Sequence, residues 1–149
     1  MGTRVKNGFA DDGGLQASLS RKQLAERMRR GESLAELDLR GLDLAGTCFD
    51  GCDLSCAKLA EAKLARCSFR EANLVGASLW QADLRDANFT GANLDDADLD
   101  LANLEGATLH RARVRRTLFP LERVPMDRIQ ESIRTGRRLV VDKPEREGR

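Results

Sequence analysis

The 149-residue sequence predicts an all-β solenoid, a tube of stacked four-sided coils with a short helix at each end. Three observations predict it. An apolar residue returns at every fifth position, phenylalanine returns at every twentieth, and charges of opposite sign stand twenty residues apart. A period of five matches neither the two-residue repeat of a strand nor the 3.6 residues of a helical turn. It is typical of solenoids, in which each unit buries its apolar side chain only by stacking on its neighbours.

The five-residue repeat is regular from residue 37 to residue 116. Divided into fives from Leu37, the chain reads LDLRG LDLAG TCFDG CDLSC AKLAE AKLAR CSFRE ANLVG ASLWQ ADLRD ANFTG ANLDD ADLDL ANLEG ATLHR ARVRR. The third letter is Leu, Phe or Val in all sixteen blocks, and the first letter is Ala in eleven. The small first letter fits a narrow tube, because such a tube has no room for a second large side chain beside each third letter.

Twenty residues, or four blocks, are predicted to complete one coil. Phe49, Phe69 and Phe89 fill the third letter at this spacing and Leu109 follows, so we expect one core column in which the rings stack. Opposite charges meet at eight pairs twenty residues apart and like charges at none, an arrangement that adjacent rungs of a β-ladder favour. The pairs are Asp38–Lys58, Asp43–Lys63, Lys63–Asp83, Asp50–Arg70, Arg66–Asp86, Arg85–Glu105, Asp95–Arg115 and Asp96–Arg116. Residues 37–119 should therefore form a rod of about four coils, roughly 20 Å long at a strand spacing of ~4.8 Å.

The blocks ADLRD, ANFTG, ANLDD, ADLDL and ANLEG resemble the repeat of the pentapeptide-repeat family. The resemblance covers residues 37–116 and implies a right-handed quadrilateral β-helix in which the first and third letters of each block point inward. AKLAE and AKLAR carry Lys where the family pattern has Asp or Asn, which matters little because that slot faces outward. Some members of the family imitate DNA by their shape and negative surface, and so inhibit DNA gyrase.

The N-terminal flank is predicted to hold a flexible segment and a cap. Residues 1–18 are polar and Gly-rich, and we expect them to be flexible. Residues 19–36 are assigned to an N-terminal capping helix, with the helix itself expected over 20–31: Ser20 is the N-cap, Gln23 completes a capping box and Gly31 is the stop. Leu24 and its helical neighbour Met28 should cover the open end of the tube.

The C-terminal flank is predicted to form a second cap after Pro120 ends the repeat. Residues 120–142 should contain a helix over 125–136 and a short strand over 137–142, and the tail 143–149 is expected to be flexible. The strand could pair with its copy in a homodimer, or serve only as a cap. Its candidate dimer contacts are Leu139, Val140 and Val141.

No catalytic, cofactor-binding or metal-binding site is predicted, and we expect a protein that is not an enzyme and needs no cofactor. Cys48, Cys52, Cys56 and Cys67 are not arranged in CxxC pairs. The register turns two of them inward and two outward, so they cannot converge on a tetrahedral zinc ion. His110 is the only histidine, and no Ser or Cys with a supporting carboxylate falls in register beside it.

Trp80 and Leu101 are the candidate protein contact, because both occupy outward slots on one side of the tube, one coil apart. Such a pair suits a protein contact; the alternative is that a loop or a terminal segment covers it. The acidic run 95–100 would suit DNA mimicry, but two of its carboxylates stand in register with arginines. The basic run 110–116 lacks the aromatic residues that stack on nucleic-acid bases, so no direct nucleic-acid binding is expected.

The composition describes a soluble protein, with 41% hydrophobic residues, 33% charged residues and a net charge of +1. Such a chain lacks a global field for DNA or anionic membranes, and no apolar run approaches the ~18 residues of a membrane span. A cytoplasmic location is the expectation, since no signal-peptide pattern is visible. The predicted function is a bacterial scaffold or protein-interaction module with an unknown protein partner; the alternative is a DNA-mimicking inhibitor of DNA gyrase or another DNA-acting enzyme. The junction GESLAELDLRGLDLAG resembles the helix-to-repeat entry of pentapeptide proteins that accompany type VI secretion.

Overall fold

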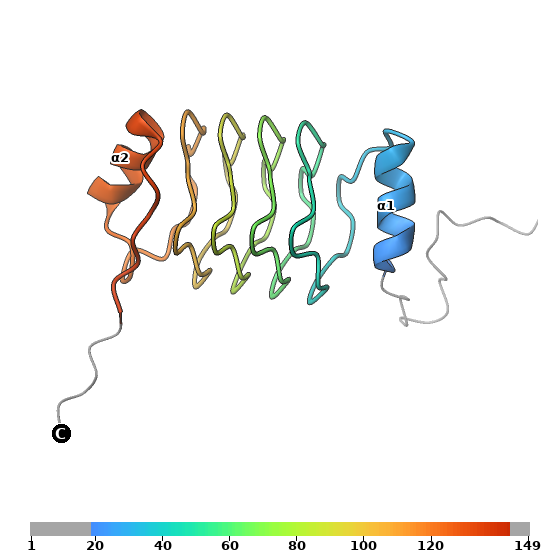
Figure 1. Cartoon of the computed structure of the whole chain (residues 1–149), viewed down its shortest axis with the longest axis horizontal. Helices are drawn as coiled ribbons and strands as arrows, with labels where there is room; N and C mark the ends of the chain where they lie inside the picture. The colour runs from blue at the N-terminus through green and yellow to red at the C-terminus, as the bar shows by residue number, and fades with distance from the viewer. Residues whose placement is uncertain (1–18, 144–149) are drawn as a thin grey trace, which may run out of the picture.

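The protein is a rod of stacked coils closed by one helix at each end (Figure 1). The structure, a computed structural model, describes residues 19–143. Helix α1 (Arg21–Arg29) lies at the N-terminal end and helix α2 (Met126–Thr135) at the C-terminal end. The segments predicted to be flexible, 1–18 and all but the first residue of 143–149, lie outside the described residues.

Each coil is bonded to the next through residues twenty apart, as the sequence predicts. Parallel bridges join the outward second letters of successive coils, from Asp38 with Lys58 to Asp98 with Leu118. At the first of these rungs, the Leu39 amide donates to the Lys58 carbonyl at 2.8 Å, and the Lys58 amide donates to the Leu37 carbonyl at 2.9 Å. Within residues 19–143 these bridges are single and no longer strand forms, because the fourth and fifth letters of each block turn the corner.

The corners are made by fifth letters with positive φ angles. Gly41 has φ of 69°, and Glu61, directly above it, has φ of 60°. Glycine adopts this left-handed conformation freely, whereas other residues incur a cost of about 1–2 kcal/mol. The stacking of each coil on its neighbours must therefore stabilise the non-glycine corners.

The core of the rod is made of first and third letters, and the predicted aromatic column is present. The rings of Phe49 and Phe69 lie 5.1 Å apart between centroids with an interplanar angle of 7°, and those of Phe69 and Phe89 lie 5.0 Å apart at 4°. Leu109 follows in the column and is fully buried. Burying each such side chain contributes about 1.5–3 kcal/mol, which makes the core the main source of stability.

The N-terminal helix is confirmed close to its predicted bounds of 20–31, but the region assigned to the cap extends too far. Ser20 and Gln23 form the reciprocal capping box, and Leu24 is buried. However, the predicted cap region 19–36 is helical only over Arg21–Arg29, and Leu34 already belongs to the first coil. The Leu34 amide donates to the Asp53 carbonyl at 2.9 Å, and its side chain is fully buried. Residues 32–36 are thus one further block, with Leu34 as its third letter.

The prediction of a C-terminal strand over 137–142 is wrong. This segment has no strand and makes one rung with the last coil, where the Gly106 amide donates to the Leu139 carbonyl and the Leu139 amide to the Ala107 carbonyl, each at 2.8 Å. Leu139 and Val141 are buried in the chain's own core, so they are not available as dimer contacts. Of the three residues proposed for a dimer, only Val140 is exposed.

Helix α2 covers another side of the last coil through polar contacts. The Leu109 amide donates to the buried Ser132 hydroxyl at 3.0 Å, and the Arg111 amide donates to the Ile133 carbonyl at 2.9 Å. These donors would otherwise lack the partner that a further coil supplies lower in the rod. The two C-terminal elements therefore satisfy three of the last amides of the ladder, those of Gly106, Leu109 and Arg111. Figure 1 shows α2 and the segment after it lying against the final coil.

Candidate protein-interaction surface

Three exposed leucines gather where the rod meets its C-terminal cap. Leu101 is 55% exposed, Leu118 58% and Leu121 51%. Leu121 lies twenty residues after Leu101, and Leu118 forms a bridge with Asp98 directly below it. We call Leu101, Leu118 and Leu121 the apolar corner. Trp80 lies one coil below Asp100 in the same corner and is half-buried, so its role as a contact stays a prediction.

The apolar corner adjoins a pocket of about 340 Å³. The pocket forms because the chain leaves the coil at Phe119 and turns back on itself: the Val124 amide donates to the Pro120 carbonyl at 3.0 Å. Its walls thus combine the last full coil with the turn that leads into α2. The lining residues are Asp100, Leu101, Phe119, Pro120, Leu121, Glu122 and Arg123.

Sequence reasoning found Leu101 but missed Leu118 and Leu121. Both belong to TLFPL (117–121), which sits above ADLDL in the register but lacks the small first letter and the polar second letter of a regular block. The twenty-residue spacing could have pointed to them, because Leu118 stands twenty residues after Asp98 and Leu121 twenty residues after Leu101.

Three carboxylates border the apolar corner. Asp98 accepts from the Asp100 amide at 2.9 Å, and Asp100 accepts from the Leu101 amide at 3.0 Å. We call Asp98, Asp100 and Glu122 the acidic rim; within residues 19–143 none of them forms an ion pair. Arg123, the basic residue of the pocket, donates through Nε to the Asp142 carbonyl at 3.4 Å.

Most of the predicted charge pairs across coils do not form as direct ion pairs in the described residues, and two of their carboxylates pair within a coil instead. Among the eight, only Asp96 and Arg116 form a direct ion pair, at 2.6 Å. Asp38 instead binds Arg40 and Asp83 binds Arg85, each at 2.7 Å. The reason is geometric: an arginine two residues on projects beside the carboxylate on the same side of the coil, so the charge ladder between coils is weaker than predicted.

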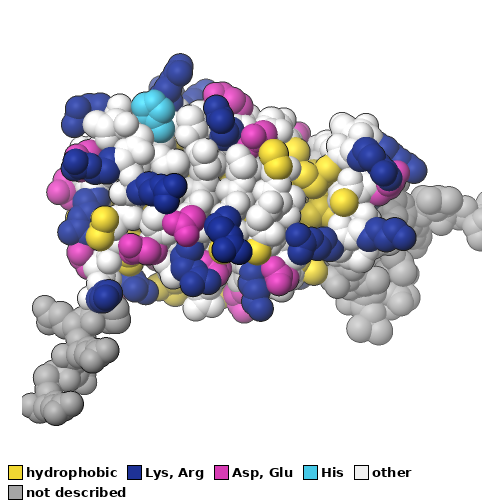
Figure 2. Space-filling view, viewed as in Figure 1, with side chains coloured by type: hydrophobic (Ala, Val, Ile, Leu, Met, Phe, Trp, Pro, Cys, Tyr) yellow, Lys and Arg dark blue, Asp and Glu magenta, His cyan; other side chains and the backbone are white. Residues whose placement is uncertain are grey.

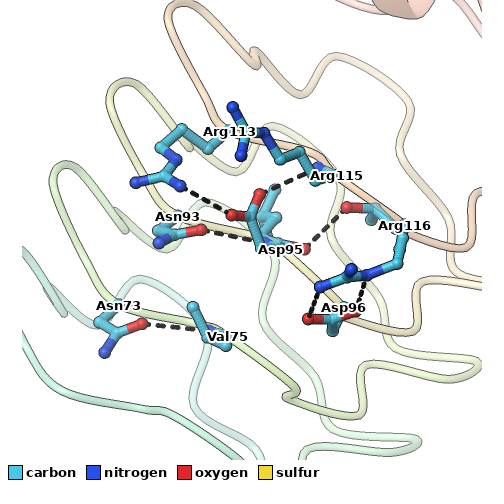
Figure 3. A network of polar contacts seen from close by, with 10 residues as sticks. Asn73, Val75, Asn93, Asp95, Asp96, Arg113, Arg115 and Arg116 are labelled. Carbon is cyan, nitrogen blue, oxygen red and sulfur yellow. Dashed lines mark hydrogen bonds and ion pairs between the residues drawn. The ribbon is translucent and has the colours of Figure 1, made fainter.

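Asp95 organises a polar network on another side of the rod (Figure 3). Its carboxylate accepts from Arg113 Nη2 at 3.0 Å and from the Arg115 backbone amide at 2.9 Å. The predicted partner Arg115 thus contributes its backbone, and Arg113 supplies the charge. With Asp96 bound to Arg116, the acidic run 95–100 is half neutralised. Figure 2 likewise shows both signs of charge interspersed on the face in view.

Acid should destabilise the fold below about pH 4. Hydrogen bonds from Arg40 hold the pKa of Asp38 below its usual 3.8, and those from Arg85 do the same for the pKa of Asp83. The unfolded chain therefore takes up protons first as the pH falls, so this stabilisation is complete above about pH 4 and is lost below it. Urea unfolding at pH 7, 5 and 3 measures the effect. An Asp38→Asn/Asp83→Asn variant should lose less stability between pH 5 and 3 than wild type; equal losses would contradict the assignment.

The four cysteines differ in exposure as the register predicts. Cys48 and Cys56 are exposed, Cys52 is half-buried and Cys67 is buried. Burial raises the pKa of the Cys67 thiol to about 11, and its Sγ donates to the Leu44 carbonyl at 3.1 Å. Over the described residues, no group of three or more His, Cys, Asp or Glu side chains could hold a metal ion.

Thiol labelling should separate these cysteines. With iodoacetamide at pH 8, Cys48 and Cys56 of the native protein should react fully, Cys52 slowly and Cys67 only after unfolding, because the thiolate is the reactive species and burial suppresses it. Peptide mass spectrometry of samples taken over time gives the order. Native labelling of Cys67 at the rate of Cys48 would contradict the inward placement.

His110 packs beneath the end of α2. Its Nδ1 is buried and has no hydrogen-bond partner among the described residues, and a Cβ added to Gly136 would lie 3.2 Å from its Cγ. The imidazole thus fills space under the helix end, where glycine leaves room for it. Neither α1 nor α2, the helices of residues 19–143, is long and apolar enough to cross a bilayer.

Comparison with known proteins supports the stacked-coil fold. A family model described as Pentapeptide repeats matches eight copies, over residues 52–91 and 82–119. A pentapeptide repeat protein of Nostoc Pcc 7120 is 36% identical, with 70% of this chain and 88% of that chain covered and a TM-score of 0.65. A pentapeptide repeat protein of the Arabidopsis thaliana thylakoid lumen is 35% identical over 54% of this chain, with a TM-score of 0.49. The match spans 59% of that protein's length.

A more distant similarity is to QnrB1, described as a plasmid-mediated fluoroquinolone resistance protein. It is 23% identical, with 60% of this chain and 54% of that chain covered and a TM-score of 0.35. No curated protein sequence matches the chain.

Proposed function

Because this chain belongs to the pentapeptide-repeat family, we propose that it is a non-enzymatic interaction module whose rigid rod presents the apolar corner to another protein. The observation that carries the proposal is a group of three leucines at the end of the rod, each more than half exposed, of which Leu101 and Leu121 line one pocket. Leucine is rarely grouped on a surface without a partner, and contiguous apolar patches mark interaction sites. Covering the half-exposed leucines would contribute on the order of 1 kcal/mol each.

The rod suits this task because its surface and its core are independent. Second and fourth letters point outward and vary freely, while first and third letters maintain the stack. Each inner coil is hydrogen-bonded on both sides, so an outward side chain is held on a stiff support. Stiff supports lower the entropy lost on binding.

Two specific roles are compatible with the family. The junction 31–46 supports an accessory role in bacterial type VI secretion. The alternative, a DNA-mimicking inhibitor of DNA gyrase, requires an extended negative surface. Asp95 and Asp96, the carboxylates that begin the acidic run, are bound to arginines, which disfavours it. A supercoiling assay tests the alternative, and inhibition at protein concentrations comparable to those of gyrase would favour it over the module.

Affinity purification from the native host tests the proposed function. Wild-type protein should retain a specific partner that Leu101→Ser and Leu121→Ser lose, because both changes place a hydroxyl in the apolar contact. Val140→Ser is the matched control, since Val140 is 59% exposed and lies outside the apolar corner. Thermal unfolding should show all variants folded. An unchanged set of partners in the two leucine variants would overturn the proposal.

A further inference from the structure

We propose that the segment received by the apolar corner is a basic amphipathic helix of the partner protein, with apolar residues on one face and Lys or Arg beside them. This inference rests on the proposed function and adds the chemistry of the partner. Two features carry it: the unpaired acidic rim around the apolar corner, and the pocket that Leu101 and Leu121 line together.

The acidic rim lacks the arginines that neutralise carboxylates elsewhere on the rod. Asp38, Asp83, Asp95 and Asp96 each bind an arginine of the chain. Asp98, Asp100 and Glu122 have none in the described structure, and Arg123 turns to the Asp142 carbonyl. Among residues 19–143, the hydrogen bonds to the side chains of Asp98 and Asp100 come only from backbone amides. The apolar corner is therefore bordered by negative charge that a partner can complement.

Cationic side chains beside an apolar anchor suit this arrangement. A single exposed ion pair contributes only about 0–1 kcal/mol, but three carboxylates around one contact select for partners of the opposite sign and speed their encounter. An acidic partner would be rejected by the same groups. The rim thus sets specificity, and the leucines provide most of the contact area.

The shared pocket of two leucines fits the face of a helix. Leu101 and Leu121 both line the pocket of about 340 Å³, one from the last full coil and the other from the turn that follows it. Residues three or four apart on a helix surface are separated by about 5–6 Å, so one helix face can place an apolar side chain in this pocket and a second one beside it. Helices that place an apolar face in a groove are a common mode of recognition.

A second copy of this chain is a poorer occupant. A symmetric dimer through the apolar corner would place the same patch of both copies face to face. Asp98, Asp100 and Glu122 of one copy would then meet the same carboxylates of the other, and like charges in contact are destabilising. The charge of the rim therefore favours a different protein.

Peptide binding to the full chain tests the inference. The probe is a fluorescent 14-residue peptide with Leu at positions i, i+3, i+4 and i+7 and Lys elsewhere, compared with versions that carry Gln or Glu in place of Lys. Anisotropy should show the Lys peptide binding at least tenfold more tightly than the Gln peptide, and the Glu peptide not binding. Leu121→Ser should abolish binding of the Lys and Gln peptides, and Val140→Ser should change neither.

The role of the rim is tested with Asp98→Asn/Glu122→Gln, which should reduce the tenfold preference for Lys to less than threefold. Asn should be tolerated at Asp98 because Asn73 and Asn93 are also second letters of their blocks. Each of them accepts a hydrogen bond from the backbone amide two residues later, as Asp98 does. Asp43→Asn is the matched control, since Asp43 occupies the same slot of another side and accepts from the Ala45 amide. It should leave the preference intact.

Each other result overturns the inference. A preference that survives in Asp98→Asn/Glu122→Gln, or falls equally in Asp43→Asn, would mean general attraction to an acidic protein. Equal binding of Gln and Lys peptides that is lost in Leu121→Ser would remove the charge argument and leave the apolar module of the proposed function standing. Failure of every peptide to bind would reject a helix as occupant. Dimerisation of wild type that Leu121→Ser abolishes would show a second copy as the occupant.

Discussion

Phe69→Ala should lower the free energy of unfolding by about 3–5 kcal/mol, the usual range for removing a buried phenylalanine. The ring is fully buried and stacks on both sides, with centroids 5.1 Å and 5.0 Å away. Truncation removes both stacking contacts and leaves a cavity that hydrogen-bonded coils cannot close. Urea unfolding monitored by circular dichroism measures the change.

Phe69→Leu is the control for this prediction. Leu is the usual third letter, so the column should stay filled and the loss should be only about 1–2 kcal/mol, from the missing aromatic stacking and a small change of volume. Equal losses for the two variants, or a loss below 1 kcal/mol for Phe69→Ala, would contradict the stacked column.

Ala87→Asp should prevent cooperative folding, whereas the same carboxylate one residue later should be almost neutral. Ala87 is buried between two large third letters, Leu84 and Phe89. An aspartate there combines an uncompensated buried charge, about 3–5 kcal/mol, with overpacking of about 1–3 kcal/mol. The sum approaches or exceeds the whole stability of many domains of this size.

Asn88→Asp tests the outward face at the adjacent position. Asn88 accepts from the Thr90 amide at 3.0 Å and from its hydroxyl at 2.6 Å, and a carboxylate oxygen can accept both. Aspartate already fills this slot in other blocks, so the change should be within about 0.5 kcal/mol. Circular dichroism and urea unfolding compare the two variants. A folded Ala87→Asp protein, or an unfolded Asn88→Asp protein, would contradict the alternation of inward and outward letters.

The interior of the fold was predictable because it repeats. The third letters, the spacing of twenty and the capping box of Ser20 and Gln23 follow from patterns that many residues support together. Handedness has no such signal, and the right-handed sense stays a prediction from the family resemblance. Leu34 was missed because its block, ESLAE, begins with an exposed Glu instead of a small inward residue.

The surface and the ends were less predictable because they do not repeat. Residues 137–142 have the composition of a strand, but only Leu139 pairs with the last coil. The arginines reach carboxylates of their own coil as readily as those of the next, so spacing alone did not identify their partners. Part of the candidate site was predictable, because the outward slot of Leu101 identified it as exposed. Leu121, which is also exposed, was missed because it belongs to the irregular block that ends the repeat.

Oxidative cross-linking of a Ser68→Cys variant is the most direct test of the register on which the apolar corner depends. Ser68 forms a bridge with Cys48, twenty residues earlier, so a thiol introduced there should form an intramolecular disulfide with that native cysteine. Peptide mass spectrometry after mild oxidation should show this cross-link in nearly all molecules. It should show none to Cys48 in Lys63→Cys, where the new thiol lies above Asp43. Absence of the link in Ser68→Cys, or an equal yield in Lys63→Cys, would contradict coils of twenty residues.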